Sequence, residues 1–112
     1  MNTAKIAVLV SGGGTNLQAL IDSRKSGIIK SGEISLVIAN NENAYALERA
    51  RNNDIENIVI TKKAAGSQEN FETELIRTLE EHNIDLIVLA GFMSILSERF
   101  TSHFANRIIN VH

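Results

Sequence analysis

The sequence contains no cysteine and no proline among its 112 residues. The absence of cysteine excludes disulfide bonds, thiolate metal ligands and a cysteine nucleophile. Average proline usage is about 5%, so roughly five or six prolines would be expected in a chain of this length. No run of about 18 apolar residues is present, and the first residues lead directly into a strand-like segment. The sequence therefore predicts neither a membrane-spanning helix nor a signal peptide.

Net charge is also small, because 11 basic and 13 acidic residues leave a formal charge of −2. A surface that binds nucleic acid is basic, so this balance gives no indication of such a partner. The hydrophobic share of 44% and the charged share of 21% are close to the averages for globular proteins. We expect residues 1–112 to form a single domain of a cytoplasmic protein, with no membrane or nucleic-acid partner.

Short apolar runs alternate with amphipathic stretches, which is the pattern of an α/β fold. Runs of aliphatic residues predict five strands, at residues 5–10, 34–39, 57–61, 86–90 and 107–111. Apolar residues at helical spacing predict four helices: from 15 to a stop at Gly27, over 44–53, from a cap at Ser67 to 82, and over 97–105. Right-handed crossovers then predict a parallel sheet of order 3-2-1-4-5 with helices on both faces.

Ligands bind at the carboxyl ends of the strands in such sheets. The first strand is followed by Ser-Gly-Gly-Gly-Thr-Asn at residues 11–16, which opens a helix. Glycines let backbone amides approach an anion, and a helix amino terminus adds positive partial charge. The Walker pattern fails because this segment contains no lysine, and the dinucleotide fingerprint fails because Leu17 stands at its third glycine. The segment suits a single phosphate, with a purely structural turn as the alternative.

Two further segments lie at predicted strand ends. Residues 91–96 form an apolar loop that could be the wall of a flat ligand's pocket or could fill the core. Asn110 and His112 share one face of the last strand, where an amide and an imidazole could stabilise an oxyanion and transfer a proton, or could be structural. His112 has no partner at ligand spacing, so no metal site is predicted. His82 and His103 fall on predicted helix surfaces, and neither is assigned a function.

These segments together resemble the phosphoribosylglycinamide formyltransferase family. The resemblance lies in residues 10–20, 89–96 and 109–112, and residues 47–50 are similar to that family's second helix. It implies a Rossmann-like formyltransferase fold and formyl transfer from 10-formyltetrahydrofolate to glycinamide ribonucleotide in purine biosynthesis.

The resemblance also implies site residues. The substrate phosphate and ribose would be bound by Gly13, Gly14, Thr15 and Asn16. The folate pocket would be lined by Met93, Ser94, Ile95, Leu96, Gln68 and Asn110. Asn110 and His112 would be catalytic, the first holding the oxyanion and the second assisting proton transfer. Gln68 and Ser94 stand where many family members have arginines, so the folate contacts carried over there differ from the family pattern.

Family members continue past the equivalent of His112 with a proline-containing segment that leads to a catalytic aspartate. The resemblance therefore implies an amino-terminal part, truncated after the fifth strand and inactive or nearly so alone. An uncovered last strand also predicts pairing with a second copy into a homodimer. One alternative is a non-catalytic phosphosugar-binding fragment. The other is a relative of formyltetrahydrofolate deformylase or methionyl-tRNA formyltransferase. Those two enzymes share the Asn-x-His element but typically lack Gly-Gly-Gly-Thr-Asn at the first loop.

Overall fold

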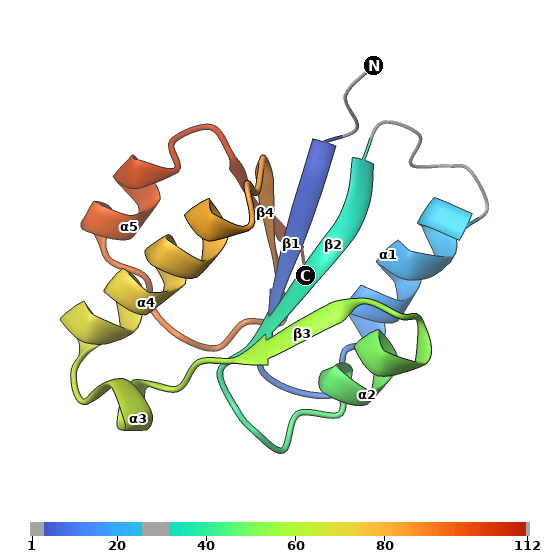
Figure 1. The fold of residues 1–112 in the computed structure, drawn as a ribbon, viewed down its shortest axis with the longest axis horizontal. Helices are drawn as coiled ribbons and strands as arrows, with labels where there is room; N and C mark the ends of the chain where they lie inside the picture. Colours follow the sequence, from blue (N-terminus) through green and yellow to red (C-terminus); the bar gives the residue numbers. More distant parts are fainter. Residues whose placement is uncertain (1–3, 26–31, 112) are drawn as a thin grey trace.

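The computed structural model describes residues 4–25 and 32–111. They form a five-stranded parallel sheet of order β3-β2-β1-β4-β5 with helices on both faces (Figure 1). The strands are β1 Ala4–Val10, β2 Gly32–Ala39, β3 Glu56–Val59, β4 Leu86–Ala90 and β5 Ile108–Val111. The helices are α1 Thr15–Lys25, α2 Ala46–Asn52, α3 Lys62–Ala65, α4 Gln68–Glu81 and α5 Glu98–His103. The predicted fold class and strand order are confirmed.

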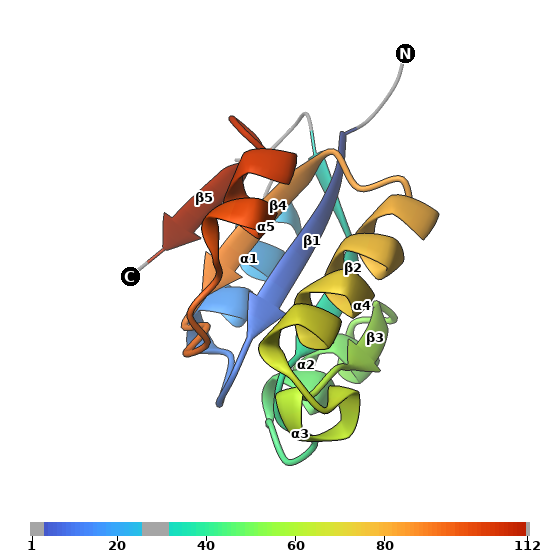
Figure 2. The same cartoon turned by 90° about the vertical axis from the view of Figure 1, so that its left-hand side faces the viewer.

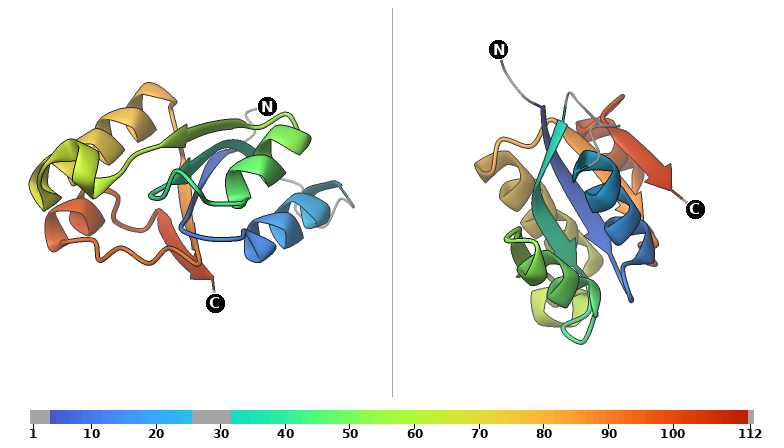
Figure 3. Two further views of the ribbon diagram at one scale, coloured as in Figure 1. Left: turned by 90° about the horizontal axis from the view of Figure 1, so that it is seen from below. Right: turned by 90° about the vertical axis from the view of Figure 1, so that its right-hand side faces the viewer.

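Two apolar clusters hold the helices to the sheet. On one face Val8 of β1 and Val88 of β4 pack with Leu17 of α1 and Leu47 of α2. The other face carries a cluster built on Leu9 of β1, with the aromatic and aliphatic side chains of α4 and α5. Figure 3 shows α1 and α2 against one face and α4 and α5 against the other. Because β1 is central and covered twice, its apolar run is nearly continuous, as expected for a parallel strand.

The predicted start of α2 is wrong by two residues, and so is the predicted end of β3. The N–H of Ala46 donates to Gly12 O at 3.1 Å, so the loop after β1 fixes where α2 begins. Thr61, which was predicted to end β3, instead caps α3 by accepting a hydrogen bond from the N–H of Ala64 at 3.1 Å. Helix α3 was not predicted, because its four residues bury none of their side chains and so leave no apolar stripe.

Helix α4 begins where the sequence predicts. The Ser67 hydroxyl accepts a hydrogen bond from the N–H of Asn70 at 3.1 Å, which satisfies one of the free donors of the first turn. Phe71, Leu75 and Leu79 are buried along one face of the helix. The predicted stop of α1 at Gly27 lies outside the described residues. None of the helices that the structure describes is long and apolar enough to cross a membrane.

The imidazole of His82 connects the end of α4 to the edge strand β3. Its Nδ1 lies 2.8 Å from Thr78 O and its Nε2 lies 2.9 Å from a Glu56 carboxylate oxygen. The hydrogen bonds that the His82 ring donates to the Glu56 carboxylate and to Thr78 O, with the charges of Glu56 and Glu81, raise the pKa of His82 above its usual value despite partial burial. His82 therefore has a structural contact that its surface position in the sequence pattern did not indicate. His103 lies on α5, where its Nε2 is 3.1 Å from a Glu80 oxygen.

The raised pKa predicts a pH-dependent contribution of His82 to stability. A raised pKa in the folded state means that the contact stabilises the fold fully below about pH 6.5 and is lost as pH rises through the folded-state value. We expect His82→Gln to lower the free energy of unfolding by at most about 1 kcal/mol at pH 5.5, because Glu56 is largely exposed. At pH 8.5 the difference should be smaller. Urea unfolding of both proteins at the two pH values measures this, and an equal difference at both would contradict it.

Candidate active site

The glycine loop (residues 11–14) joins β1 to α1 and has a backbone that requires glycine at its last position. Gly14 has φ +80°, and a Cβ built there would lie 2.7 Å from Ala46 Cβ and 2.9 Å from Ala46 Cα. A side chain at Gly14 would therefore collide with the start of α2. At Gly12 and Gly13 an added Cβ would meet nothing within 4 Å. The three glycines are thus not equivalent, and Gly14 sets how closely α2 approaches the loop.

The start of α1 offers N–H donors to an anion. The first turn of a helix has N–H groups with no intrahelical acceptor, and the helix dipole makes that end positive. The first turn of α1, which contains Thr15 and Asn16, carries no acidic residue. These are the features of an anion-binding helix terminus.

Arg49 of α2 holds the glycine loop in place by a hydrogen bond to its backbone. It was not identified from the sequence as a site residue. Its Nε donates to Gly13 O at 2.7 Å, and a terminal nitrogen donates to the Gln18 side chain at 3.3 Å. The guanidinium also lies 5.2 Å from the centre of the Tyr45 ring. The contact places a permanent positive charge beside the loop. The sequence gives little indication of this contact, because Arg49 is 36 positions from Gly13.

The β4–α5 loop (residues 91–97) presents two large apolar side chains to solvent. Met93 is 83% exposed and Ile95 is 87% exposed, whereas Phe92 and Leu96 pack partly against the core. The sequence left two interpretations of this segment, a pocket wall or a part of the core, and each fits every second residue. Phe92 and Leu96 anchor the loop to the core, and Met93 and Ile95 remain available as an apolar wall.

Polar contacts connect this loop to its neighbours across the carboxyl edge of the sheet. The N–H of Met93 donates to Ser11 Oγ at 2.7 Å, which joins the loop to the glycine loop. Ser94 Oγ accepts a hydrogen bond from the Asn40 side chain at 2.6 Å, at the end of β2. Ser11 and Asn40 were not predicted as site residues. Their roles depend on partners 82 and 54 positions away, which spacing in the sequence does not reveal.

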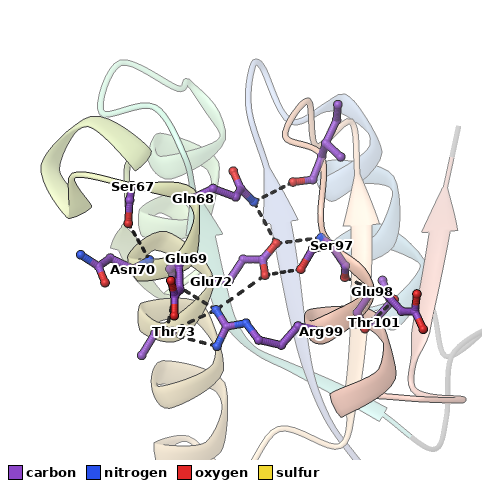
Figure 4. A network of polar contacts seen from close by, with 11 residues as sticks. Ser67, Gln68, Glu69, Asn70, Glu72, Thr73, Ser97, Glu98, Arg99 and Thr101 are labelled. Atoms are coloured by element: carbon purple, nitrogen blue, oxygen red, sulfur yellow. Dashed lines mark hydrogen bonds and ion pairs between the residues drawn. The ribbon is translucent and has the colours of Figure 1, made fainter.

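Gln68 and the buried carboxylate of Glu72 hold the same loop from α4 (Figure 4). Gln68 Nε2 donates to Ile95 O at 3.0 Å and to Glu72 at 2.8 Å. Glu72 also accepts the N–H of Ser97 at 2.7 Å and its hydroxyl at 2.5 Å, and Arg99 lies 3.7 Å away. Burial alone would raise the pKa of Glu72, but the hydrogen bonds from Ser97 and Gln68 and the Arg99 charge together hold this pKa below its usual value.

Asn110 lies on β5 in register with Leu89 of β4, near the carboxyl edge that carries both loops. Its side chain is exposed. Figure 2 shows β5 at the edge of the sheet beside β4. His112 lies outside the described residues. The described part of the chain holds no group of three His, Asp or Glu side chains that could bind a metal ion.

The geometry of this edge of the sheet defines a class of protein. A parallel Rossmann-like sheet places a helix terminus with free N–H donors, an apolar loop and an exposed amide along one carboxyl edge, as in α/β proteins that bind small molecules. Residues 4–112 match the family model described as formyl transferase, and the chain belongs to that family.

Individual relatives agree with this assignment. The chain is 45% identical over 107 residues to phosphoribosylglycinamide formyltransferase of Escherichia coli, covering 96% of this chain and 50% of that protein. It is 43% identical over 111 residues to the trifunctional purine biosynthetic protein adenosine-3 of Gallus gallus, covering 99% of this chain and 11% of that protein.

A solved structure shows the same fold. The phosphoribosylglycinamide formyltransferase of Coxiella burnetii in complex with CHES superposes with a TM-score of 0.93 at 42% identity, covering 99% of this chain and 52% of that one. The chain thus spans about half the length of the bacterial relatives that it matches.

Proposed function

We propose that this chain provides the substrate-phosphate site, part of the formyl-donor site and two catalytic residues of a phosphoribosylglycinamide formyltransferase. The reaction is transfer of the formyl group of 10-formyltetrahydrofolate to the amine of glycinamide ribonucleotide. The observation that carries the proposal is the 2.7 Å hydrogen bond from the N–H of Met93 to Ser11 Oγ. It holds a loop suited to an apolar ligand beside a loop suited to a phosphate, as a two-substrate transfer requires.

The substrate phosphate would bind at the amino terminus of α1, with Gly13, Gly14, Thr15 and Asn16 around it. Arg49 supports this assignment in two ways. Its hydrogen bond to Gly13 O holds the glycine loop in shape, and its charge lowers the cost of bringing a phosphate dianion to that place.

The formyl donor would lie against the β4–α5 loop. The exposed side chains of Met93 and Ile95 offer the apolar surface that a flat pterin ring needs, and backbone groups of the loop can fix its orientation. Ser94, Leu96 and Gln68 would form the rest of this pocket, with Asn110 at its end.

In the transfer, the substrate amine attacks the formyl carbon and the carbonyl oxygen becomes an oxyanion. The amide N–H of Asn110 would donate a hydrogen bond to that oxyanion, which is the kind of contact that lowers such a barrier most. His112 would assist electrostatically and in moving the proton from the attacking amine. The tetrahedral intermediate then collapses: the bond from the formyl carbon to the folate nitrogen breaks, and that nitrogen leaves with the proton that the attacking amine has lost.

Three finer statements also belong to the proposal: residues 1–112 form one domain, the protein acts in the cytoplasm, and two copies pair through the edge of β5. An edge strand with unpaired backbone groups supports the last, as does Ile109, which is 49% exposed there. A sedimentation experiment that finds only monomer at high concentration would remove the pairing from the proposal.

The proposal is tested by binding and by turnover. Inorganic phosphate, followed by amide NMR, should shift the signals of residues 13–16 and leave the turn at residues 41–43 unaffected. Shifts centred on Lys62 and Lys63 instead would indicate adventitious binding and contradict the assignment. The complete natural gene product that carries residues 1–112 should transfer formyl to glycinamide ribonucleotide.

Residues 1–112 alone should have little or no turnover in the same assay, because they correspond to about half the length of the bacterial relatives. The other half would supply the catalytic aspartate and help to orient the reactants. Orientation of the reactants accounts for roughly 7–11 kcal/mol of such a barrier, and an acid–base group for roughly 10²–10⁴-fold of the rate. Phosphate binding without turnover by the complete gene product would favour a non-catalytic phosphosugar-binding protein.

A further inference from the structure

Glu72 is a charged side chain in a place where an apolar one would be expected. It follows Phe71 on α4 and is 1% exposed, between the apolar face of the helix and the β4–α5 loop. A buried carboxylate is costly unless hydrogen bonds and charges compensate it. The proposed chemistry uses no group at this position. The reason for a buried carboxylate here is therefore to be sought in the groups that it binds.

The groups that donate hydrogen bonds to Glu72 all belong to the β4–α5 loop or contact it. One carboxylate accepts both the N–H and the hydroxyl of Ser97, the last residue of the loop. It also accepts from Gln68, whose same nitrogen donates to Ile95 O in the middle of the loop. Figure 4 shows these side chains converging on the carboxylate from α4 and from the loop. Glu72 therefore fixes the loop at two points, directly at Ser97 and through Gln68 at Ile95.

We propose that Glu72 is a positioning residue for the formyl-donor site, because it holds the β4–α5 loop in the conformation that presents Met93 and Ile95. This inference rests on the proposed function of that loop. A carboxylate suits the role because all three of its hydrogen-bonding partners are donors. A glutamine in its place has the same size, but its NH₂ group would face one or more N–H or O–H donors and could not accept from them.

The test uses the complete natural gene product, with Glu72→Gln beside Glu74→Gln as a matched control. Glu74 lies on the same helix, but its carboxylate pairs with Arg77 at the surface, where both groups are about half exposed. Calorimetry measures the Kd of tetrahydrofolate and, separately, of glycinamide ribonucleotide. Glu72→Gln should weaken tetrahydrofolate binding about 10-fold, because a small displacement of a positioned loop has effects of this order or larger. Binding of glycinamide ribonucleotide should change less than about 2-fold.

A milder variant keeps the test valid if Glu72→Gln does not fold. Gln68→Ala removes the link to Ile95 O together with one of the three hydrogen bonds to Glu72, and it leaves both bonds from Ser97 in place. It should weaken tetrahydrofolate binding by about 3-fold, a part of the loss expected for the full network. Amide hydrogen exchange at Ser97, which reports the loop directly, should become faster in Glu72→Gln and stay unchanged in Glu74→Gln.

The outcomes separate this inference from the proposed function. Unchanged tetrahydrofolate affinity in Glu72→Gln and Gln68→Ala would overturn the inference, and so would equal weakening of both ligands, which would indicate general destabilisation. If the unaltered protein binds both ligands but transfers no formyl group, the proposed function fails while the selective loss in Glu72→Gln still supports the positioning role.

Discussion

Replacing Gly14 by alanine is expected to destabilise the fold by about 2–5 kcal/mol and to weaken phosphate binding at least about 10-fold. Two costs add up. A non-glycine residue held at a φ of +80° costs about 1–3 kcal/mol, and forcing a methyl group into packed atoms costs a similar amount. The methyl group cannot be accommodated by a side-chain rotation, because it would meet the Cα as well as the Cβ of Ala46 at less than 3 Å. Helix α2 would have to move away from the loop.

Gly12→Ala is the matched control for this prediction. An added Cβ there meets no atom within 4 Å, and the φ of Gly12 is not in the left-handed region. Its free energy of unfolding, measured by urea denaturation, should stay within about 0.5 kcal/mol of the unaltered protein. If Gly14→Ala were as stable as Gly12→Ala, the close approach of α2 to the glycine loop would not exist in solution.

Much of the fold could be predicted because the local signals agree with the tertiary structure. Residues 86–90 were predicted as a strand and form β4, since a run of aliphatic residues is what a strand covered on both faces requires. The start of α4 was predicted from Ser67, whose capping hydrogen bond is local. In β2 the prediction began at residue 34, but the strand begins at Gly32, because pairing with Ala4 of β1 extends it.

The site was predicted less completely, because its supporting residues act over long distances in sequence. The glycine loop, the β4–α5 loop and Asn110 were found as motifs at strand ends. The contacts that fix the two loops come from Arg49 and Glu72, which lie 36 positions from Gly13 and 25 positions from Ser97. The sequence did contain an indication of Glu72, because this carboxylate stands next to Phe71 at the edge of the apolar stripe of α4. Ser97 was predicted to be the first residue of α5 but precedes that helix, and its hydroxyl donates to Glu72.

Replacing Asn110 by aspartate in the complete gene product is expected to lower kcat by about 10²–10³-fold. Loss of one donor to a developing oxyanion has an effect of this size, and a carboxylate in its place also repels the negative charge. Asn110 is exposed, so the free energy of unfolding should change by less than about 0.5 kcal/mol. The KM for glycinamide ribonucleotide should stay within about 3-fold, because the proposed phosphate contacts lie on the glycine loop and not on β5.

Two comparisons isolate the role of the Asn110 amide. Asn110→Ala removes the donor without adding charge and should lose somewhat less of kcat than Asn110→Asp. Ile109→Val changes the preceding residue on β5, whose side chain lies on the opposite face of the strand, and should leave kcat unaffected. Steady-state kinetics of formyl transfer at saturating concentrations of both substrates measures all three. If Asn110→Asp kept kcat within about 3-fold of the unaltered protein, the oxyanion would have to be stabilised by another group, and the catalytic centre would lie away from β5.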